Sequence, residues 1–393
     1  AAGKVAMVHF FAFNLAYPAA STPRFFSLFQ PTPASRKRMQ LTLVVPELIW
    51  PEPEDRDVLA DLACPALETL LMRGRQTSQP PQSLEATLAD RFGHPEGAPY
   101  GAFRLLGETE SSLEIEEKSW LIADPVHLRF HQERLILADG TSLSISPEEA
   151  QALADGLNAH FADLGRFHVS AADRWYLHLA DETGNGPLHR YVAPPLSTVA
   201  GRSVEHLLPE LLHERAIRTL MNEIQTVLHA HPVNRRREDE GRLPVNSLWL
   251  WGSGRLPERC ETDFDGVWST NTLARGLARA AGVRTHPVPT DAERFFEHAA
   301  PDTAHLIVLE DLIGPVQFEN GAAYRTAIES LEVRWFAPLR KALLKGQLKS
   351  LHIEATTVYA ILNWDCQRTE QWMFWKKPRR LADLALALAQ ASD

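Results

Sequence analysis

Short apolar runs alternate with amphipathic stretches along most of this chain. Residues 41–45 and 306–309 are apolar runs typical of strands buried on both faces of a parallel sheet, and residues 348–353 predict a further strand. Apolar side chains recur at helical spacing in four other segments, at residues 57–73, 270–281, 324–344 and 381–391. Strands that alternate with helices predict an α/β fold, in which helices cover both faces of a mostly parallel sheet.

The pattern changes between residues 111 and 192. Short strand-like runs, such as residues 120–123, are separated by turns, and Ser146 followed by Pro147 marks the start of a helix. We therefore expect a small α+β insertion domain at residues 111–192.

The main α/β body is then expected in two segments, residues 39–110 and residues 193–393. The second segment is expected to resume with a long helix near residues 211–229. We expect the strand that follows, at residues 247–251, to belong to the main sheet.

Residues 1–38 differ from the rest of the chain. An apolar run at residues 5–16 superficially resembles a signal peptide, but the segment ends in the basic cluster Arg36, Lys37 and Arg38, directly before the strand-like run that follows Met39. We interpret residues 1–38 as a dispensable leader or a misassigned start.

Composition narrows the class of protein. The 393 residues include 50 acidic and 40 basic side chains, and a net charge of −10 disfavours nucleic-acid binding through a broad basic face. Three widely spaced cysteines, Cys64, Cys260 and Cys366, indicate neither a zinc knuckle nor a disulfide framework, so we expect a reducing, cytoplasmic location. After residue 38 no run approaches the ~18 apolar residues of a membrane-spanning helix, so we expect no membrane association.

One region carries a specific motif. His231-Pro-Val-Asn-Arg-Arg-Arg is followed by Gly241-Arg-Leu-Pro-Val-Asn-Ser-Leu-Trp-Leu-Trp-Gly-Ser-Gly. Several fixed spacings at once resemble the archaeal-type, cofactor-independent phosphoglycerate mutases of the alkaline phosphatase superfamily. Residues 135–158 and 268–283 are similar to other passages of that family, so the resemblance spans most of residues 40–360. It is closest to a divergent bacterial branch described as regulatory or phosphoglycerate mutase-like.

The motif suggests five candidate ligand-binding residues, His231, Asn234, Arg235, Arg237 and Asn246. Guanidinium groups bind phosphate through their planar set of donors, and asparagines fix loops by bonding to the backbone. The alternative is a basic surface run, balanced by the acidic residues at 238–240.

The resemblance implies phosphoryl transfer between the 2- and 3-hydroxyls of phosphoglycerate, by a serine nucleophile and two metal ions. Ser83 stands at the nucleophile position, although Thr87 replaces the family's histidine, and Ser83 also suits a helix cap.

Four acids stand where the family places metal ligands or near these positions: Glu47, Glu310, Asp311 and Glu354. The histidines that should accompany them are missing, and transition metals favour several convergent ligands with imidazole among them. The sequence therefore predicts degenerate metal sites and no metal cofactor, with Mn, Mg or Zn as the alternative.

Three functions remain open. The first is a non-catalytic or repurposed protein that binds a small phosphorylated metabolite or a protein partner and acts in regulation. The second is an active metal-dependent phosphoglycerate mutase or phosphatase. The third is a metal-independent enzyme of unknown class that uses the acids and arginines.

Overall fold

A computed structural model gives the structure of the chain from residue 39 onward. It describes residues 39–52, 54–108, 115, 117–131, 134–181, 183–201, 204, 207, 215–373, 375–376 and 380–392. The segment interpreted as a leader, residues 1–38, lies outside the described residues.

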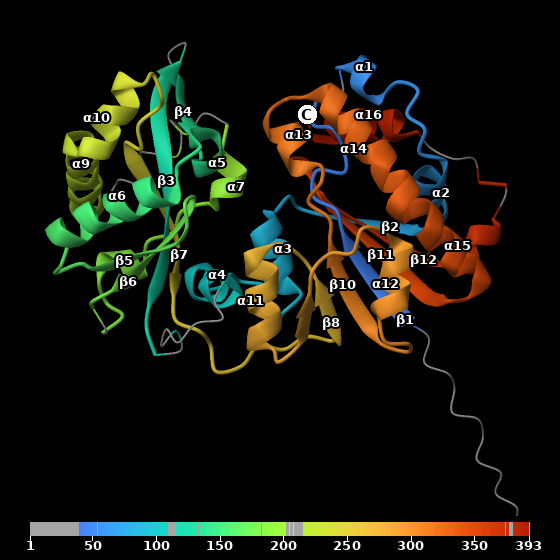
Figure 1. The fold of residues 1–393 in the computed structure, drawn as a ribbon. Coiled ribbons are helices and arrows are strands. Elements are labelled where there is room, and N and C mark those ends of the chain that lie inside the picture. Colours follow the sequence, from blue (N-terminus) through green and yellow to red (C-terminus); the bar gives the residue numbers. More distant parts are fainter. Residues whose placement is uncertain are drawn as a thin grey trace, which may run out of the picture. The chain divides into compact units, whose positions relative to one another are not determined.

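The main sheet has seven strands in the order β2-β12-β11-β1-β10-β8-β9 (Figure 1). Their bounds are β1 Met39–Val44, β2 Arg75–Gln79, β8 Gly266–Trp268, β9 Arg284–His286, β10 Ala304–Val308, β11 Leu348–Thr356 and β12 Ile361–Gln367. β1 is parallel to β10 and β11, and β8 is parallel to β10 and β9. β12 and β2 form an antiparallel edge. The prediction of an α/β fold with a mostly parallel sheet is confirmed.

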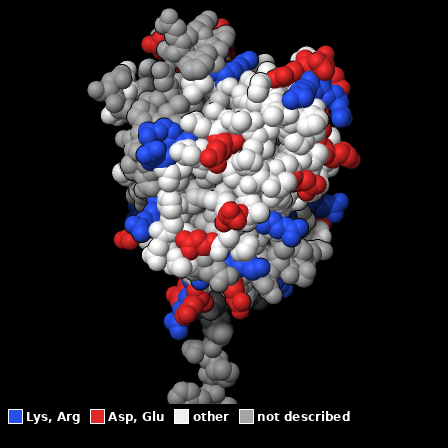
Figure 2. Space-filling model, turned by 90° about the vertical axis from the view of Figure 1, so that its left-hand side faces the viewer, with Lys and Arg blue, Asp and Glu red and all other residues white. Residues whose placement is uncertain are grey.

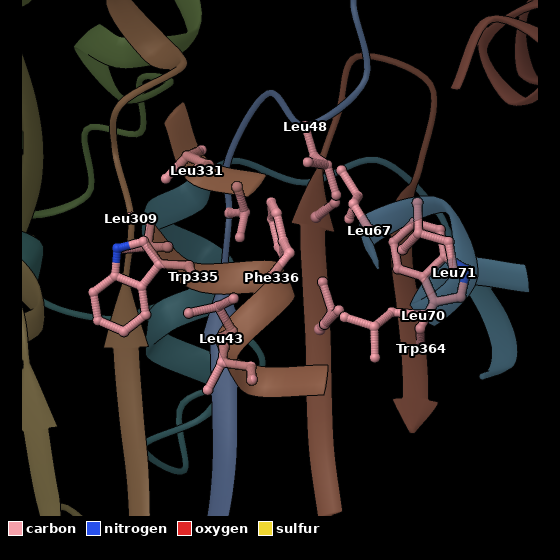
Figure 3. Packing of buried hydrophobic residues seen from close by; sticks show 14 of the residues in the cluster. Leu43, Leu48, Leu67, Leu70, Leu71, Leu309, Leu331, Trp335, Phe336 and Trp364 are labelled. Atoms are coloured by element: carbon pink, nitrogen blue, oxygen red, sulfur yellow. The ribbon is translucent and has the colours of Figure 1, made fainter. Parts of the chain in front are cut away.

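The apolar runs of β1 and β10 supply side chains to both faces of this sheet. Leu43 and its register partner Ile307 join a core cluster that contains Trp335 and Phe336 (Figure 3). The next pair, Val44 and Val308, belongs to a second cluster on the opposite face. Burial on both faces explains why these strands read as continuous apolar runs.

Helices cover both faces. The first cluster is closed by α1 Arg56–Leu59, α2 Pro65–Arg73, α12 Ala292–His298, α13 Ile313–Gln317, α14 Gly321–Leu331, the π-helical segment η2 Glu332–Phe336, α15 Ala337–Lys345 and α16 Leu381–Ser392. The second cluster is closed by α3 Leu84–Asp90, α4 Tyr100–Glu108 and α11 Thr272–Ala280. A short 3-10 turn, η3 Glu370–Trp372, follows β12.

A second sheet is antiparallel throughout. It contains β4 Arg134–Ala138, β3 Trp120–His131, β6 Arg174–Leu179 and β5 Gly165–Ala171 in this order, and β7 Ser247–Gly254 also pairs with β3. Its helical segments are α5 Gly140–Leu143, α6 Pro147–His160, η1 Pro187–His189, α7 Leu196–Val199, α9 Arg215–Ala230 and α10 Pro232–Asp239.

The strand at residues 247–251 was expected in the main sheet, and this expectation is wrong. β7 lies beside β3, with Leu248 and Leu250 in one core cluster and Trp249 and Trp251 in another. A strand covered on both faces reads as a continuous apolar run whether its neighbours are parallel or antiparallel, so the pattern did not identify the sheet. The antiparallel part thus draws on residues beyond 111–192.

Charged side chains of both signs are interspersed on the side of the molecule shown in Figure 2. On the described part of that side, no broad basic face is present. A search of the described helices finds none that is both long and apolar enough to span a bilayer.

Candidate functional site

Two cavities lie at the carboxyl ends of β1, β10 and β11, where open parallel sheets generally bind ligands. The first, which we call the acidic pocket, has a volume of about 310 Å³ and is lined by the five acids Glu85, Asp124, Asp139, Asp173 and Glu310, together with Arg104 and Arg174. The second, which we call the hydroxyl pocket, measures about 270 Å³ and is lined by Glu47, Ser83, Ser197, Thr198, Thr356 and Thr357. Both share Leu84, Ser197 and Ile313, so they adjoin.

The hydroxyl pocket contains two of the predicted site residues, Glu47 and Ser83. Glu47 directly follows the β1 run, and its φ of 57° is in the left-handed region that side chains disfavour. Its amide donates to the carbonyl oxygen of Thr356 at 2.9 Å, which ties the ends of β1 and β11 together. Ser83 caps α3, because its Oγ accepts a hydrogen bond from the Ala86 amide at 3.1 Å.

The acidic pocket contains a carboxylate that the sequence analysis missed, Glu85, in the first turn of α3. The Ser197 hydroxyl of α7 lies 2.8 and 2.9 Å from its two carboxylate oxygens. Burial raises the pKa of Glu85, and hydrogen bonds from Ser197 and Ser83 oppose the rise.

Glu310, a predicted site residue, enters the same pocket from the end of β10. The Asn271 side-chain amide donates to its Oε1 at 2.7 Å and Thr270 donates to its Oε2 at 3.4 Å. Asn271 also caps α11, since its carbonyl oxygen accepts from the amides of Leu273 and Ala274. Burial raises the pKa of Glu310, and the nearby Glu85 carboxylate raises it further.

Both arginines of the acidic pocket are already paired. Arg104 forms two hydrogen bonds of 2.7 Å with Asp124, and its guanidinium lies 5.2 Å from the ring centre of Tyr176. Arg174 lies 3.1 Å from Glu108 and 3.3 Å from Asp173. The positive charges of this pocket are therefore neutralised by neighbouring carboxylates.

The other two predicted acids do not line either cavity. Glu354 is buried and pairs with the Arg91 Nε at 3.0 Å, and Arg91 also lies 3.0 Å from the His352 Nε2. Asp311 pairs with Arg334 at 2.5 Å. Each carboxylate is thus turned to an arginine.

The donor set does not fit a metal centre of the kind that the resemblance implies. Within the described residues, no three His, Cys, Asp or Glu side chains come together in a group that could hold a metal ion. Glu47 and Glu310 line different cavities, while Glu354 and Asp311 are held by guanidinium groups. A protein metal centre needs several convergent ligands.

The five residues of the 231–246 motif lie in the antiparallel part and line neither cavity. His231 caps α10 by accepting from the Val233 amide. Asn234 is buried and donates to the carbonyl oxygens of Leu228 and Val245 at 2.7 Å each.

Asn246 bonds to both the amide and the carbonyl oxygen of Leu128, at 2.8 and 2.9 Å. Arg235 is exposed, whereas Arg237 is fully buried against Glu149. Four of the five therefore stabilise loops and helix ends, and a ligand-binding role for the motif stays a prediction.

Sequence signals existed for some of the missed pocket residues. Asn271 follows a short strand and opens a helix, which is both a cap signal and a position at a strand's carboxyl end. Glu85 lies two residues after the candidate nucleophile. No local signal joins Arg104 to Asp124, because their contact depends on how α4 packs on β3.

Comparisons with known proteins show what the chain is similar to. No family model matches the chain. A 2,3-bisphosphoglycerate-independent phosphoglycerate mutase of Methanosarcina mazei is 28% identical over 216 residues, which cover 52% of this chain and 51% of that protein. Phosphoglycerate mutase 2 of Methanothermobacter thermautotrophicus is 36% identical over 163 residues, 40% of this chain and 39% of the relative. The chain thus spans about half the length of the curated relatives it matches.

A solved structure of a Pyrococcus horikoshii protein shares the fold, with a TM-score of 0.53, 16% identity and coverage of 91% of this chain and 97% of that one. The resemblance to the cofactor-independent phosphoglycerate mutases is confirmed, and the chain is phosphoglycerate mutase-like in sequence.

Proposed function

We propose that this phosphoglycerate mutase-like protein does not catalyse metal-dependent phosphoryl transfer and instead binds a ligand in the two adjoining cavities. One observation carries the proposal: the carboxylates at the ends of β10 and β11 do not converge, since Glu354 is paired with Arg91 and Asp311 with Arg334. A guanidinium group that neutralises a carboxylate removes the charge that would attract a metal ion.

The position of Ser83 supports the same reading. Its Oγ caps α3, and the family's histidine is replaced by Thr87, whose buried hydroxyl has no hydrogen-bond partner within the described residues. Neither threonine nor a helix cap supplies the basic imidazole that activates a nucleophile or binds a metal. The regulatory role, the protein partner and the cytoplasmic location belong to the same proposal and rest on the resemblance.

A metal-independent enzyme is the second candidate, and one observation favours it. The Ser83 hydroxyl hydrogen-bonds to Glu85, a carboxylate whose pKa burial raises. A carboxylate of raised pKa beside a hydroxyl is an arrangement suited to general-base catalysis.

Elemental analysis and a turnover assay test the proposal together. Protein purified with Mn, Mg and Zn supplied throughout is expected to hold far less than one metal ion per chain and to show no conversion of 3- to 2-phosphoglycerate, while an active mutase assayed alongside converts it. The variant Ser83→Ala is expected to show the same low metal content and the same absence of turnover as the wild type. Stoichiometric metal together with turnover that Ser83→Ala abolishes would show that the protein is an active mutase.

A further inference from the structure

The acidic pocket has the volume of a small-molecule site. Its volume of about 310 Å³ reaches the lower end of the range for such sites, roughly 300–1,000 Å³. Main-sheet elements contribute Glu85, Asn271 and Glu310, and the antiparallel part contributes Asp124 and Ser197. The pocket also has an apolar wall, formed by Leu84, Leu196, Ala200, Trp251, Leu273 and Ile313.

The charges of this pocket do not balance. Five acids and two arginines line it. Arg104 is bonded through both Nη atoms to Asp124, and Arg174 is shared between Glu108 and Asp173. Among the described residues that line the pocket, no guanidinium group is therefore left for an anionic ligand.

Within the described residues, three acids of this pocket form no ion pair: Glu85, Asp139 and Glu310. Asp139 is bonded to the Ser142 hydroxyl and to the Gln317 side-chain amide. The hydrogen-bond donors of Glu85 and Glu310 are neutral: the Ser197 and Ser83 hydroxyls for Glu85, and the Asn271 amide and Thr270 hydroxyl for Glu310. Within the described residues, neither glutamate forms an ion pair, and each is partly buried. The two lie close enough that the charge of Glu85 raises the pKa of Glu310.

Two carboxylates that line one cavity together with apolar side chains suit one kind of ligand. A cation between them relieves their mutual repulsion and forms charge-assisted hydrogen bonds, while its carbon skeleton covers the apolar wall. A phosphate group in the same place would add like charge to an already negative, partly desolvated site.

We propose that the acidic pocket binds a small organic cation, whose ammonium or guanidinium group lies between Glu85 and Glu310. This inference rests on the proposed function, because it takes the cavity as a binding site. The proposed ligand is positively charged, whereas the phosphorylated metabolite expected from the sequence is negatively charged.

Calorimetric titration tests the inference with five probes. Three are cations (agmatine, 1,5-diaminopentane and tyramine), one is the neutral analogue 1,5-pentanediol, and one is 3-phosphoglycerate. We expect saturable binding of at least one cation, weaker at high salt, and no binding of the diol or of 3-phosphoglycerate. Glu85→Gln and Glu310→Gln are each expected to weaken cation binding roughly tenfold or more, because a hydrogen bond to a charged group contributes about 1.5–3 kcal/mol.

Glu293→Gln serves as the matched control. It removes one negative charge from an exposed position on α12, away from the pocket, and is expected to leave cation binding unchanged. If one of the two pocket variants fails to fold, the other variant and the salt dependence still decide the outcome.

Three results would overturn the inference: binding of none of the cations, cation binding that both pocket variants leave unchanged, or binding of 3-phosphoglycerate that the cations do not displace. Binding of 3-phosphoglycerate without turnover would contradict the proposal of a cationic ligand but would still agree with the proposed non-catalytic function. Metal-dependent turnover would contradict the proposed function, whether or not the cations bind.

Discussion

At the scale of single residues, Arg237 is the buried arginine of the 231–246 motif. It is fully buried, with Nη1 2.6 Å from Glu149, Nη2 2.6 Å from the Leu143 carbonyl oxygen and Nε 2.8 Å from that of Leu243. Arg237→Met removes the side-chain donors of the Leu143 and Leu243 carbonyl oxygens, whereas Glu149 keeps its bonds to Arg242. We expect it to lower the free energy of unfolding by about 2–5 kcal/mol, measured by urea denaturation, because each buried acceptor left unpaired costs roughly 1–3 kcal/mol.

Arg235→Met is the matched control, since Arg235 is exposed two residues earlier on the same helix. It is expected to change stability by less than about 0.5 kcal/mol. Equal effects of the two substitutions would contradict the structural role assigned to Arg237.

The same contrast shows what a sequence can predict of a single residue. The cap at Ser83 was predicted as an alternative to nucleophile, because capping depends on neighbours within three residues. The burial of Arg237 was not predicted, because Glu149 and Leu143 are distant in the chain and reach it only through the packing of α6 against α10. A run of basic residues has the same sequence pattern whether its side chains face solvent or the core.

At the scale of elements, α4 and α11 pack with their backbones in contact. A Cβ atom on Gly107 would lie 1.7 Å from the carbonyl oxygen of Thr272, and one on Gly276 would lie 1.7 Å from that of Phe103. Gly276→Ala must therefore push the helices apart. We expect it to lower the free energy of unfolding by about 3 kcal/mol or more, with a matching fall in melting temperature.

Gly314→Ala provides the control, because no atom lies within 4 Å of a Cβ placed on this glycine of α13. Alanine favours helix more than glycine does, so this variant is expected to be neutral or slightly stabilising. A Gly276→Ala protein as stable as Gly314→Ala would mean that α4 and α11 do not pack this closely.

Helices and strands were predicted well where the order of apolar and polar residues determines them. The sheet to which a strand belongs was predicted less well, because it depends on segments distant in the chain. β1 and β10 were recognised from apolar runs, and the helix capped by Ser146 begins at Pro147 as expected. β7 was recognised as a strand but assigned to the wrong sheet. Its pairing with β3 joins residues more than a hundred positions apart, and no local pattern encodes such a register.

At the scale of the whole molecule, several histidines lie in buried or half-buried positions. Burial lowers the pKa of six histidines among the described residues: His94, His127, His168, His231, His286 and His305. Three glutamates whose pKa burial raises, Glu68, Glu85 and Glu310, act in the opposite sense. The histidines therefore lower the stability of the folded chain in mild acid, and a substitution at one of them can measure this effect.

His168 is the clearest case, because burial, assisted by the charges of Arg166, His178 and Lys118, lowers its pKa from 6.5 to about 4. Its ring lies 5.2 Å from that of Trp120. Above pH 6.5 the imidazole is neutral in both states. As the pH falls below 6.5 the unfolded chain takes up the proton first, so the contribution to stability is lost between pH 6.5 and 4 and is constant below that.

The shift corresponds to roughly 3 kcal/mol at most, and solvent screening of this partly exposed side chain reduces the effect to about 1–2 kcal/mol. His168→Gln removes the titrating group, so the stability difference between wild type and variant, followed by urea denaturation from pH 7.5 to 4, should move in favour of the variant by that amount. Gln151→Asn, at an exposed position on α6, removes no titrating group and should give a difference that does not vary with pH. A pH-independent difference for His168→Gln as well would show that its imidazole titrates alike in the folded and unfolded chains.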